Sequence, residues 1–438
     1  MLAGVAVVAL AVAGAGCGSD DDDNGATTAA GGGAATQARD VSGSVSVIGI
    51  WTGDEQRSFQ AVIDKFNEQY PDVTVRYTSA GDNLPTVVST AVEGGNPPDI
   101  ATIAQPGLIR EFQSKGALRP IDYARDTVTA NYAPDFVRLG TIDGRLYSFV
   151  YKGANKSTVW YNVEAFRNAG VDDPDDWDEF LRNARTLGAS GVPAYSIAGA
   201  DGWTLTDLFE NIYLREAGPA KYDQLSEHRI PWTDPSVRSA LRTMAQVLGD
   251  RQNIAGGTAG ALQTEFPASV EAVFQDPPRA AQVIEGDFVP GVVADTTRLE
   301  PETGYNVYAF PEIGSSQDYV VGGGDSITTF RDTPAIRAFV EFLASPEGAT
   351  VWAERGGFSS PNRGVSEDAY PDEITKEVAT AIAEARTFRF DMSDLAPAAF
   401  GGTPSQGEWK ILQDFLANPS DINGTAAKLE ASAARAYR

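Results

Sequence analysis

The sequence predicts an α/β protein in which a mostly parallel sheet carries helices on both faces. The chain has 438 residues, which suggests two domains or one large two-lobed unit. From residue 45 onward, strand-like and helix-like segments alternate. This order favours parallel strands joined by helices, and ligands of such sheets bind beyond the carboxyl ends of the strands.

The first part of the globular region follows this alternation closely. Phe59, Val62, Ile63 and Phe66 share one face of the first expected helix, and Pro71 ends it. A pair of glycines at 94–95 ends the second helix, and a glycine at 116 ends the third. We expect strands at 45–51, 73–77 and 98–103, and helices at 54–71, 84–95 and 108–116.

Helices dominate the rest of the chain. Good start and stop signals predict helices at 174–188, 204–218 and 234–250. Strand-like segments return at 304–314 and 318–330. Two further helices are expected over 334–357, and the tail from 366 onward is expected to be helical again.

Charge and residue counts exclude several functions. The chain has 34 Lys and Arg residues against 60 Asp and Glu residues, a formal charge of −26. Nucleic acids and anionic membrane surfaces need a basic footprint, so neither is an expected partner. With one cysteine, Cys17, and one histidine, His228, a Cys/His zinc site cannot be built. We interpret His228 as a surface residue and expect no metal and no cofactor.

The N-terminal segment has the pattern of a lipoprotein leader. Residues 2–13 are almost wholly Ala, Val, Leu and Gly, a run too short to span a bilayer. Small residues then precede Cys17, which resembles the lipobox of bacterial lipoproteins. We therefore predict a signal peptide at 1–16, a lipid on Cys17 and a flexible acidic, Gly- and Ala-rich tether at 17–40. The alternative is a plain secretion signal followed by a free cysteine.

Seven motifs carry a resemblance to a known family. In chain order they are "GNPPDIATIAQPG", "KSTVWYN", "GWTLTDLFEN", "DPPRAAQVIEGDF", "GGGDSITTF", "WAERGGFSSPN" and "FDMSDL". Together they resemble family 1 of the extracellular solute-binding proteins of bacterial ABC sugar importers. This is the maltose-binding-protein-like group, and the resemblance is to its α-glucoside-type branch.

The resemblance implies a two-lobed periplasmic-binding-protein-like fold of type II, with a ligand cleft between the lobes. One lobe would comprise 41–149 plus 311–358, and the other 150–310 plus 359–438. Crossings are expected near 150–154, 309–312 and 359–363. Closure of the lobes on a sugar, an α-glucoside or another oligosaccharide, would present the complex to membrane permease subunits. We expect a monomer outside the cytoplasm, anchored to the cell membrane through Cys17, and no enzymatic activity.

A sugar site needs aromatic faces and acceptors for adjacent hydroxyl groups. Candidates of these types lie within the motifs, mostly at strand ends and helix starts. Trp203 and Asp207 stand four residues apart, so one helix face can present both. The expected ligand-binding residues are Trp51, Thr52, Gly53, Glu55, Gln105, Lys152, Trp203, Asp207, Asp287, Phe288, Asp325, Gly357 and Phe358.

Each candidate also has a purely structural interpretation. Trp51 could be a core aromatic residue, and Glu55 a carboxylate that favours the start of a helix. The three glycines before Asp325 could form a bulge or allow a close backbone approach. Asp391 and Asp394 are expected to cap a helix first and to bind ligand second.

Two other functions remain open at this level. A glycoside hydrolase would need two carboxylates flanking the bond, such as Glu55 and Asp207. A binder of a non-sugar solute, such as an amino acid or a peptide, is the other alternative. No nucleophile elbow or other catalytic motif occurs in the sequence, which favours a binding protein.

Overall fold

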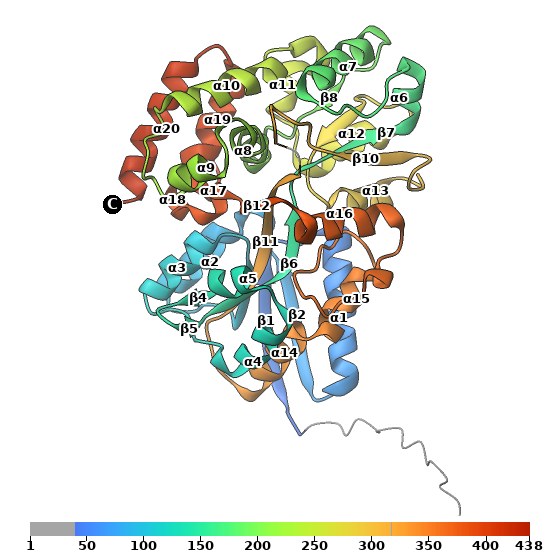
Figure 1. Cartoon of the computed structure of the whole chain (residues 1–438). Helices are drawn as coiled ribbons and strands as arrows, with labels where there is room; N and C mark the ends of the chain where they lie inside the picture. The colour runs from blue at the N-terminus through green and yellow to red at the C-terminus, as the bar shows by residue number, and fades with distance from the viewer. Residues whose placement is uncertain (1–39, 317) are drawn as a thin grey trace, which may run out of the picture. The chain divides into compact units, whose positions relative to one another are not determined.

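Two main sheets organise the part of the chain that the computed structural model describes, residues 40–316 and 318–438 (Figure 1). The predicted leader, Cys17 and the tether up to residue 39 lie outside these residues. The larger sheet has the order β12-β11-β3-β1-β2, and β6 also pairs with β11. Its strands are β1 (Gly43–Gly49), β2 (Val73–Ser79), β3 (Ile100–Ile103), β6 (Ser148–Asn155), β11 (Tyr319–Thr329) and β12 (Thr387–Phe390).

The smaller sheet has the order β10-β7-β9-β8. Its strands are β7 (Thr158–Asn162), β8 (Tyr195–Ser196), β9 (Gln282–Ile284) and β10 (Tyr305–Ala309). A separate hairpin joins β4 (Thr141–Ile142) and β5 (Arg145–Leu146).

The expectation of a mostly parallel sheet holds for the first three strands of the larger sheet, but both sheets are mixed. β1 runs parallel to β2 and β3, whereas β11 runs antiparallel to β3 and β6. The chain enters β11 from β10 of the smaller sheet and not through a crossover helix. The rule that ties crossover helices to parallel strands therefore does not apply to β11.

The helices surround these sheets. The expected apolar face of α1 is confirmed, since Phe59, Val62, Ile63 and Phe66 are all buried. The helices are α1 (Gly53–Gln69), α2 (Leu84–Glu93), α3 (Pro106–Ser114), α4 (Arg125–Asn131), α5 (Pro134–Leu139), α6 (Val163–Ala169), α7 (Trp177–Ala189), α8 (Trp203–Ala217), α9 (Pro219–Ser226), α10 (Pro235–Leu248), α11 (Gly257–Ala261), α12 (Phe266–Phe274), α13 (Val289–Thr296), α14 (Pro334–Ala344), α15 (Pro346–Ala353), α16 (Glu373–Glu384), α17 (Met392–Leu395), α18 (Ala398–Gly401), α19 (Gly407–Ala417) and α20 (Ile422–Ala436).

The tail from residue 366 is mainly helical, as expected, but it also contains a short strand. This strand, β12, pairs with β11 in parallel, from Tyr319 opposite Thr387 to Gly322 opposite Phe390. A strand of only four residues carries too little alternation to be recognised without its partner strand.

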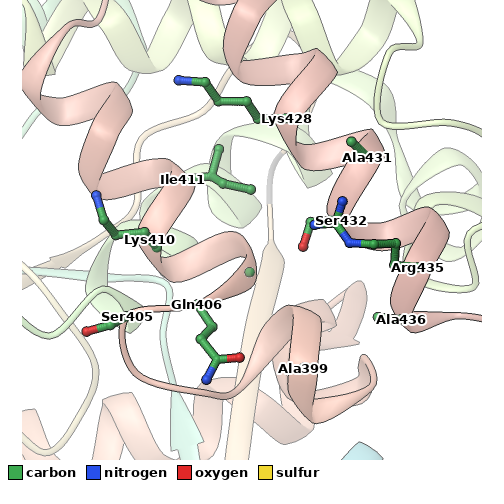
Figure 2. A pocket seen from close by; sticks show the side chains of 11 residues that line it. Ala399, Ser405, Gln406, Lys410, Ile411, Lys428, Ala431, Ser432, Arg435 and Ala436 are labelled. Carbon is green, nitrogen blue, oxygen red and sulfur yellow. The ribbon is translucent and has the colours of Figure 1, made fainter.

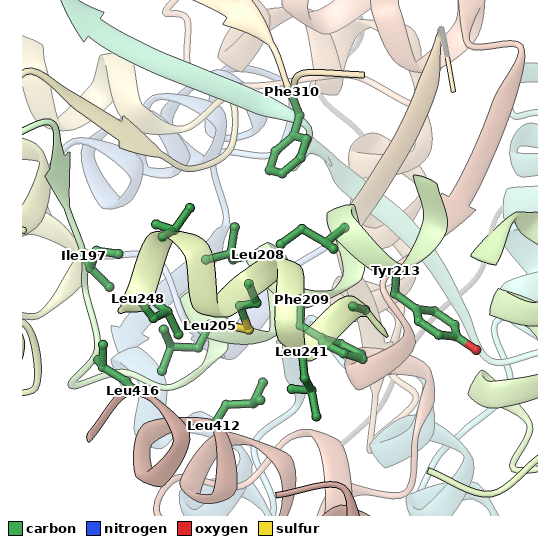
Figure 3. Close-up of a cluster of buried hydrophobic side chains, with 14 of the residues drawn as sticks. Ile197, Leu205, Leu208, Phe209, Tyr213, Leu241, Leu248, Phe310, Leu412 and Leu416 are labelled. Atoms are coloured by element: carbon green, nitrogen blue, oxygen red, sulfur yellow. The ribbon is translucent and has the colours of Figure 1, made fainter. Parts of the chain in front are cut away.

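Helix α8 lies in the centre of a large apolar core (Figure 3). Leu205 and Phe209 of α8 pack in this core with Leu241 of α10 and Leu412 of α19. Residues 204–215 of α8 are all buried, which includes polar residues such as Asp207 and Glu210. A helix that is buried all round must satisfy these polar groups internally, and the functional site explains how it does so.

Candidate functional site

The site lies where the chain passes from the larger sheet to the smaller one. β6 ends at Asn155 and β7 begins at Thr158, so only two residues separate strands of different sheets. Lys152 lies on β6 and Lys156 lies in the connection. The Lys152 side chain is 3% exposed and that of Lys156 is 11% exposed. Because buried lysines need counter-charges, each of the two gathers carboxyl groups around it.

The first centre forms around Lys152. Its Nζ lies 2.9 Å from Oε1 of Glu55, which belongs to the first turn of α1. Asp325 is the direct partner of Lys152 in the antiparallel pairing of β6 with β11. Burial acts to lower the pKa of Lys152, but Glu55, Asp325 and Asp287 outweigh burial and raise this pKa. Lys152 is therefore a cation that several carboxyl groups share.

Trp51 holds one of these carboxyl groups in place. Its indole Nε1 donates a hydrogen bond of 2.6 Å to Oδ2 of Asp325. The ring itself is buried. Its centroid lies 4.7 Å from that of Phe59 and 4.8 Å from that of Trp352, on which it packs edge-on. In this structure Trp51 orients Asp325 and presents no ring face to solvent. Burial raises the pKa of Asp325 to about 6, against the opposing effect of Lys152.

The second centre forms around Lys156. Its Nζ lies 3.0 Å from Asp207 of α8, 2.5 Å from Asp391 and 3.7 Å from Asp394. Burial raises the pKa of Asp207 to about 8, although Lys156 opposes this shift. Burial would also raise the pKa of Asp391, but Lys156 and a hydrogen bond with Asp207 lower it. Near pH 7, therefore, Asp207 carries the one proton of this pair and Asp391 is ionised.

The carboxyl groups on α17 are fixed by capping. Asp391 is the N-cap of α17, as expected, and its side chain accepts from the backbone N–H of Asp394 at 2.9 Å. Glu210 of α8 accepts from the backbone N–H groups of Met392 at 2.7 Å and Ser393 at 3.0 Å. Glu210 therefore positions the helix start that supplies two of the three partners of Lys156.

Three aromatic rings from separate segments form an aromatic patch: Trp203, Phe266 and Phe288. Trp203 begins α8, Phe266 begins α12 and Phe288 precedes α13. Their ring centroids lie 5.1 to 5.9 Å apart, with interplanar angles from 54° to 82°. All three rings are half-buried.

The aromatic patch lies beside both lysine centres. Nζ of Lys152 is 5.3 Å from the Phe288 ring centroid, and Nζ of Lys156 is 5.9 Å from that of Trp203. Both distances are within the range of a cation–π contact. The patch and the two centres therefore form one continuous site.

Three buried carboxyl oxygens in the site have no partner among the described residues. They are Oδ2 of Asp207, Oε2 of Glu285 and Oδ1 of Asp287. The other oxygen of Asp287 accepts from the backbone N–H of Asn155 at 2.9 Å and from the Ser359 hydroxyl. Burial, together with Asp207 and Asp201, raises the pKa of Glu285. A buried acceptor without a donor needs an explanation, and a ligand hydroxyl group supplies one.

Asp82 and Asp201 add acidic groups next to Trp203. Asp82 lies in a 3₁₀ turn (Gly81–Asn83) after β2 of the larger sheet, and Asp201 lies just before α8. Burial raises the pKa of Asp82, and the neighbouring Trp203 partly offsets this rise. Burial and the nearby Asp82 raise the pKa of Asp201 to about 7. Strand ends of the larger sheet and the start of α8 therefore meet at the aromatic patch.

The glycine run before Asp325 allows a close approach. Gly322, Gly323 and Gly324 lie within β11, and the pairing with β6 shifts between Asp325 and Ser326. A Cβ on Gly323 would lie 2.9 Å from Cε of Lys156. Both expected explanations, a bulge and a close approach, therefore describe this segment.

In the part of the chain that the structure describes, the remaining candidates form no ion pair or cation–π contact with either lysine. Thr52 is the N-cap residue of α1, and Gly53 begins that helix. Gln105 is buried at the start of α3. Gly357 has a φ of 61°, and Phe358 is buried and stacked on Trp352 at 5.3 Å.

Sequence reasoning missed part of the site: Lys156, Glu285, Asp82, Asp201 and Phe266. Lys156 opens the motif "KSTVWYN", and Glu285 lies in "DPPRAAQVIEGDF", so both were within quoted motifs. Asp82 follows a strand, where the rule for ligands at strand ends would have found it. No signal in the sequence separates Phe266 from other core aromatic residues.

Crossing strands with a polar and aromatic site beside them are typical of a two-lobed binding protein. A family model described as bacterial extracellular solute-binding protein matches residues 52–350. The chain belongs to this family. The expected class, a solute-binding protein outside the cytoplasm and not an enzyme, is thereby confirmed.

Similar proteins support this assignment over most of the chain. The osmoprotective compounds-binding protein of Synechocystis sp. is 31% identical over 383 residues, 85% of this chain and 88% of that protein. The alpha-glucosides-binding periplasmic protein of Rhizobium meliloti is 30% identical over 406 residues, 89% of this chain and 87% of that protein.

Solved structures show the same fold. A bacterial solute receptor with an exclusive preference for β-D-galactopyranose has a TM-score of 0.79 at 19% identity, and covers 90% of this chain and 99% of its own. A solute-binding protein in complex with raffinose has a TM-score of 0.74 at 16% identity. The match covers 91% of this chain and 100% of that protein. These likenesses confirm the two-lobed α/β fold. Among residues 40–316 and 318–438, no helix is both long enough and apolar enough to cross a bilayer.

Proposed function

We propose that this protein binds a neutral sugar, an α-glucoside or another oligosaccharide, and delivers it to the permease subunits of an ABC importer. The observation that carries the proposal is the aromatic patch between the two lysine centres, next to the partnerless acceptor oxygens of Glu285 and Asp287. The names of the relatives agree, since they include binders of α-glucosides, β-D-galactopyranose and raffinose.

The chemistry of a sugar matches this arrangement. A pyranose ring presents flat C–H faces, which stack on aromatic rings such as Trp203. Its hydroxyl groups donate hydrogen bonds, and Glu285 and Asp287 each keep one oxygen ready to accept. Its oxygens accept hydrogen bonds, which Lys152 and Lys156 can donate. Hydrogen bonds to such charged groups contribute about 1.5–3 kcal/mol each.

The charge of the site favours a neutral ligand. Six carboxyl groups surround two lysines: Glu55, Asp287, Asp325, Asp207, Asp391 and Asp394. An anionic solute would meet this excess of acid and lose affinity. The hydrolase alternative lacks support, because its two carboxylates, Glu55 and Asp207, are each engaged by a different lysine.

The lobes and the anchor belong to the same proposal. We place the lobe boundaries at 149/150, 310/311 and 358/359, with hinge closure around the ligand. The change of sheet between β6 and β7, and the end of β10 at Ala309, support the first two crossings. A lipid on Cys17 would hold the monomer at the cell membrane, close to the permease.

Calorimetry with the purified protein tests the ligand class. We expect neutral mono- or disaccharides to bind and to be recovered unchanged, whereas amino acids and dipeptides do not bind. Glu285→Gln should weaken sugar binding at least about tenfold, because an amide presents one acceptor in place of two. Asp126→Asn is the matched control, since Asp126 is an exposed acidic residue on α4.

Two results would contradict the proposal. One is binding of amino acids or dipeptides in preference to every sugar tested. The other is an equal affinity for sugar in Glu285→Gln and Asp126→Asn, which would remove the partnerless oxygen from the site.

A further inference from the structure

A cavity lies away from the site described above, between α19, α20 and the loop that precedes α19 (Figure 2). Its volume is about 650 Å³. On α20 the lining residues Lys428, Ser432 and Arg435 recur at helical spacing, so one face of that helix borders the cavity. Gln406 and Lys410 line it from the side of α19.

The lining is basic, although the protein as a whole is strongly acidic. Lys410, Lys428 and Arg435 all line the cavity, and no aspartate or glutamate does. Within the described part of the chain, Lys428 and Arg435 form no ion pair. Lys410 pairs with the exposed Asp414. In a chain with a formal charge of −26, such a local concentration of unpaired cations is a feature that a ligand of opposite charge can use.

Neutral donors complete the lining. Ser405 and Ser432 bring hydroxyl groups, and Ser432 is itself buried. The first turn of α19 begins beside the cavity at Gly407, and no side chain caps it. The carboxyl group of that turn, Glu408, is buried and does not line the cavity, and burial raises its pKa.

The geometry points to an oxyanion site in this cavity, for a phosphate group that Lys428 and Arg435 bind and the serine hydroxyl groups orient. Arginine and lysine side chains converge on such ions by charge-assisted hydrogen bonds. The phosphate group can belong to free inorganic phosphate or to the headgroup of an anionic lipid. This inference is independent of the sugar site, which uses other residues.

Calorimetry with inorganic phosphate at constant ionic strength tests the first source. The variant is Lys428→Gln with Arg435→Gln, and both side chains are exposed, so folding should be unaffected. The matched control, Arg110→Gln with Arg182→Gln, removes the same charge from exposed positions elsewhere. We expect the cavity variant to raise the Kd for phosphate about tenfold or more, as the loss of one or two charge-assisted hydrogen bonds implies, and the control to leave it within about twofold.

Vesicle sedimentation tests the second source. The Cys17→Ser chain is used, so that no lipid on the protein contributes, with phosphatidylglycerol vesicles against phosphatidylcholine vesicles. Loss of vesicle binding in the cavity variant alone supports a headgroup site. Absence of binding to both phosphate and phosphatidylglycerol would overturn the proposal. So would equal binding by the cavity variant and the control variant, with melting temperatures confirming that both are folded.

Discussion

Replacement of Lys156 by methionine should destabilise the protein in a way that depends on pH. Lys156 lies within 3.0 Å of Asp207 and Asp391, and all three side chains are at most 11% exposed. Removal of one partner from a buried ion pair costs about 3–5 kcal/mol. Asp207 already carries a proton near neutral pH, since its pKa is about 8. We therefore expect a loss at the lower end of this range, about 3 kcal/mol in the free energy of unfolding at pH 8.

The direction of the pH dependence follows from the two aspartates. Lys156 lowers the pKa of Asp391, so the ionised Asp391 contributes stability above the unfolded pKa of about 3.9 that is lost at lower pH. Without Lys156, the pKa of Asp391 rises and this carboxyl holds a proton that the unfolded chain releases. Stability then falls as pH rises, by up to about 1.4 kcal/mol per pH unit for that carboxyl. The loss relative to wild type should therefore be larger at pH 8 than at pH 5.

Urea denaturation at pH 5, 6.5 and 8, followed by circular dichroism, measures these differences. Lys115→Met is the matched control, because its ion pair with Glu111 is about 40% exposed on both sides. Such exposed pairs contribute about 0–1 kcal/mol. A loss for Lys156→Met that is no larger than the control, or that shrinks as pH rises, would refute the reasoning.

Three further changes test other parts of the structure. Trp203→Ala should weaken sugar binding by a few kcal/mol and leave the fold intact, since the ring is half-buried in the aromatic patch; unchanged affinity in calorimetry would exclude this ring from the site. Cys17→Ser should move the protein from the membrane fraction to the soluble fraction of the cells, and continued pelleting would contradict a lipid on Cys17. Gly324→Ala should lower the melting temperature, because its Cβ would lie 2.6 Å from the carbonyl oxygen of Lys152; Gly260→Ala, with its nearest contact at 3.4 Å, should not.

Local patterns in the sequence were sufficient for the elements with strong periodicity. Helix α1 shows its buried face through Phe59, Val62, Ile63 and Phe66, and it begins within one residue of the predicted position. Asp391 could be predicted as a cap because capping depends on neighbouring residues alone. β12 could not be predicted, since its stability comes from pairing with β11, which lies more than 50 residues away.

The sequence indicated the types of residue that form the candidate site better than it indicated the role of each residue. Trp203, Asp207, Asp287 and Phe288 lie together as side chains of the expected kinds. Trp51 illustrates what local patterns cannot decide, because its exposure depends on Trp352 and Asp325, about 300 residues further along the chain. For the same reason, the sequence analysis selected Lys152 as a candidate and did not select Lys156. Only the fold shows that α8 and the start of α17 bring carboxyl groups to Lys156.

The burial of the tryptophans has a practical consequence. Of the seven in the chain, six are buried, and Trp203 is the exception. A water-soluble quencher such as acrylamide should therefore extinguish the emission of Trp203 and leave the other six indoles bright. The molecule thus contains its own optical probe, placed on the surface that a ligand would cover, and occupancy can be followed in unlabelled protein.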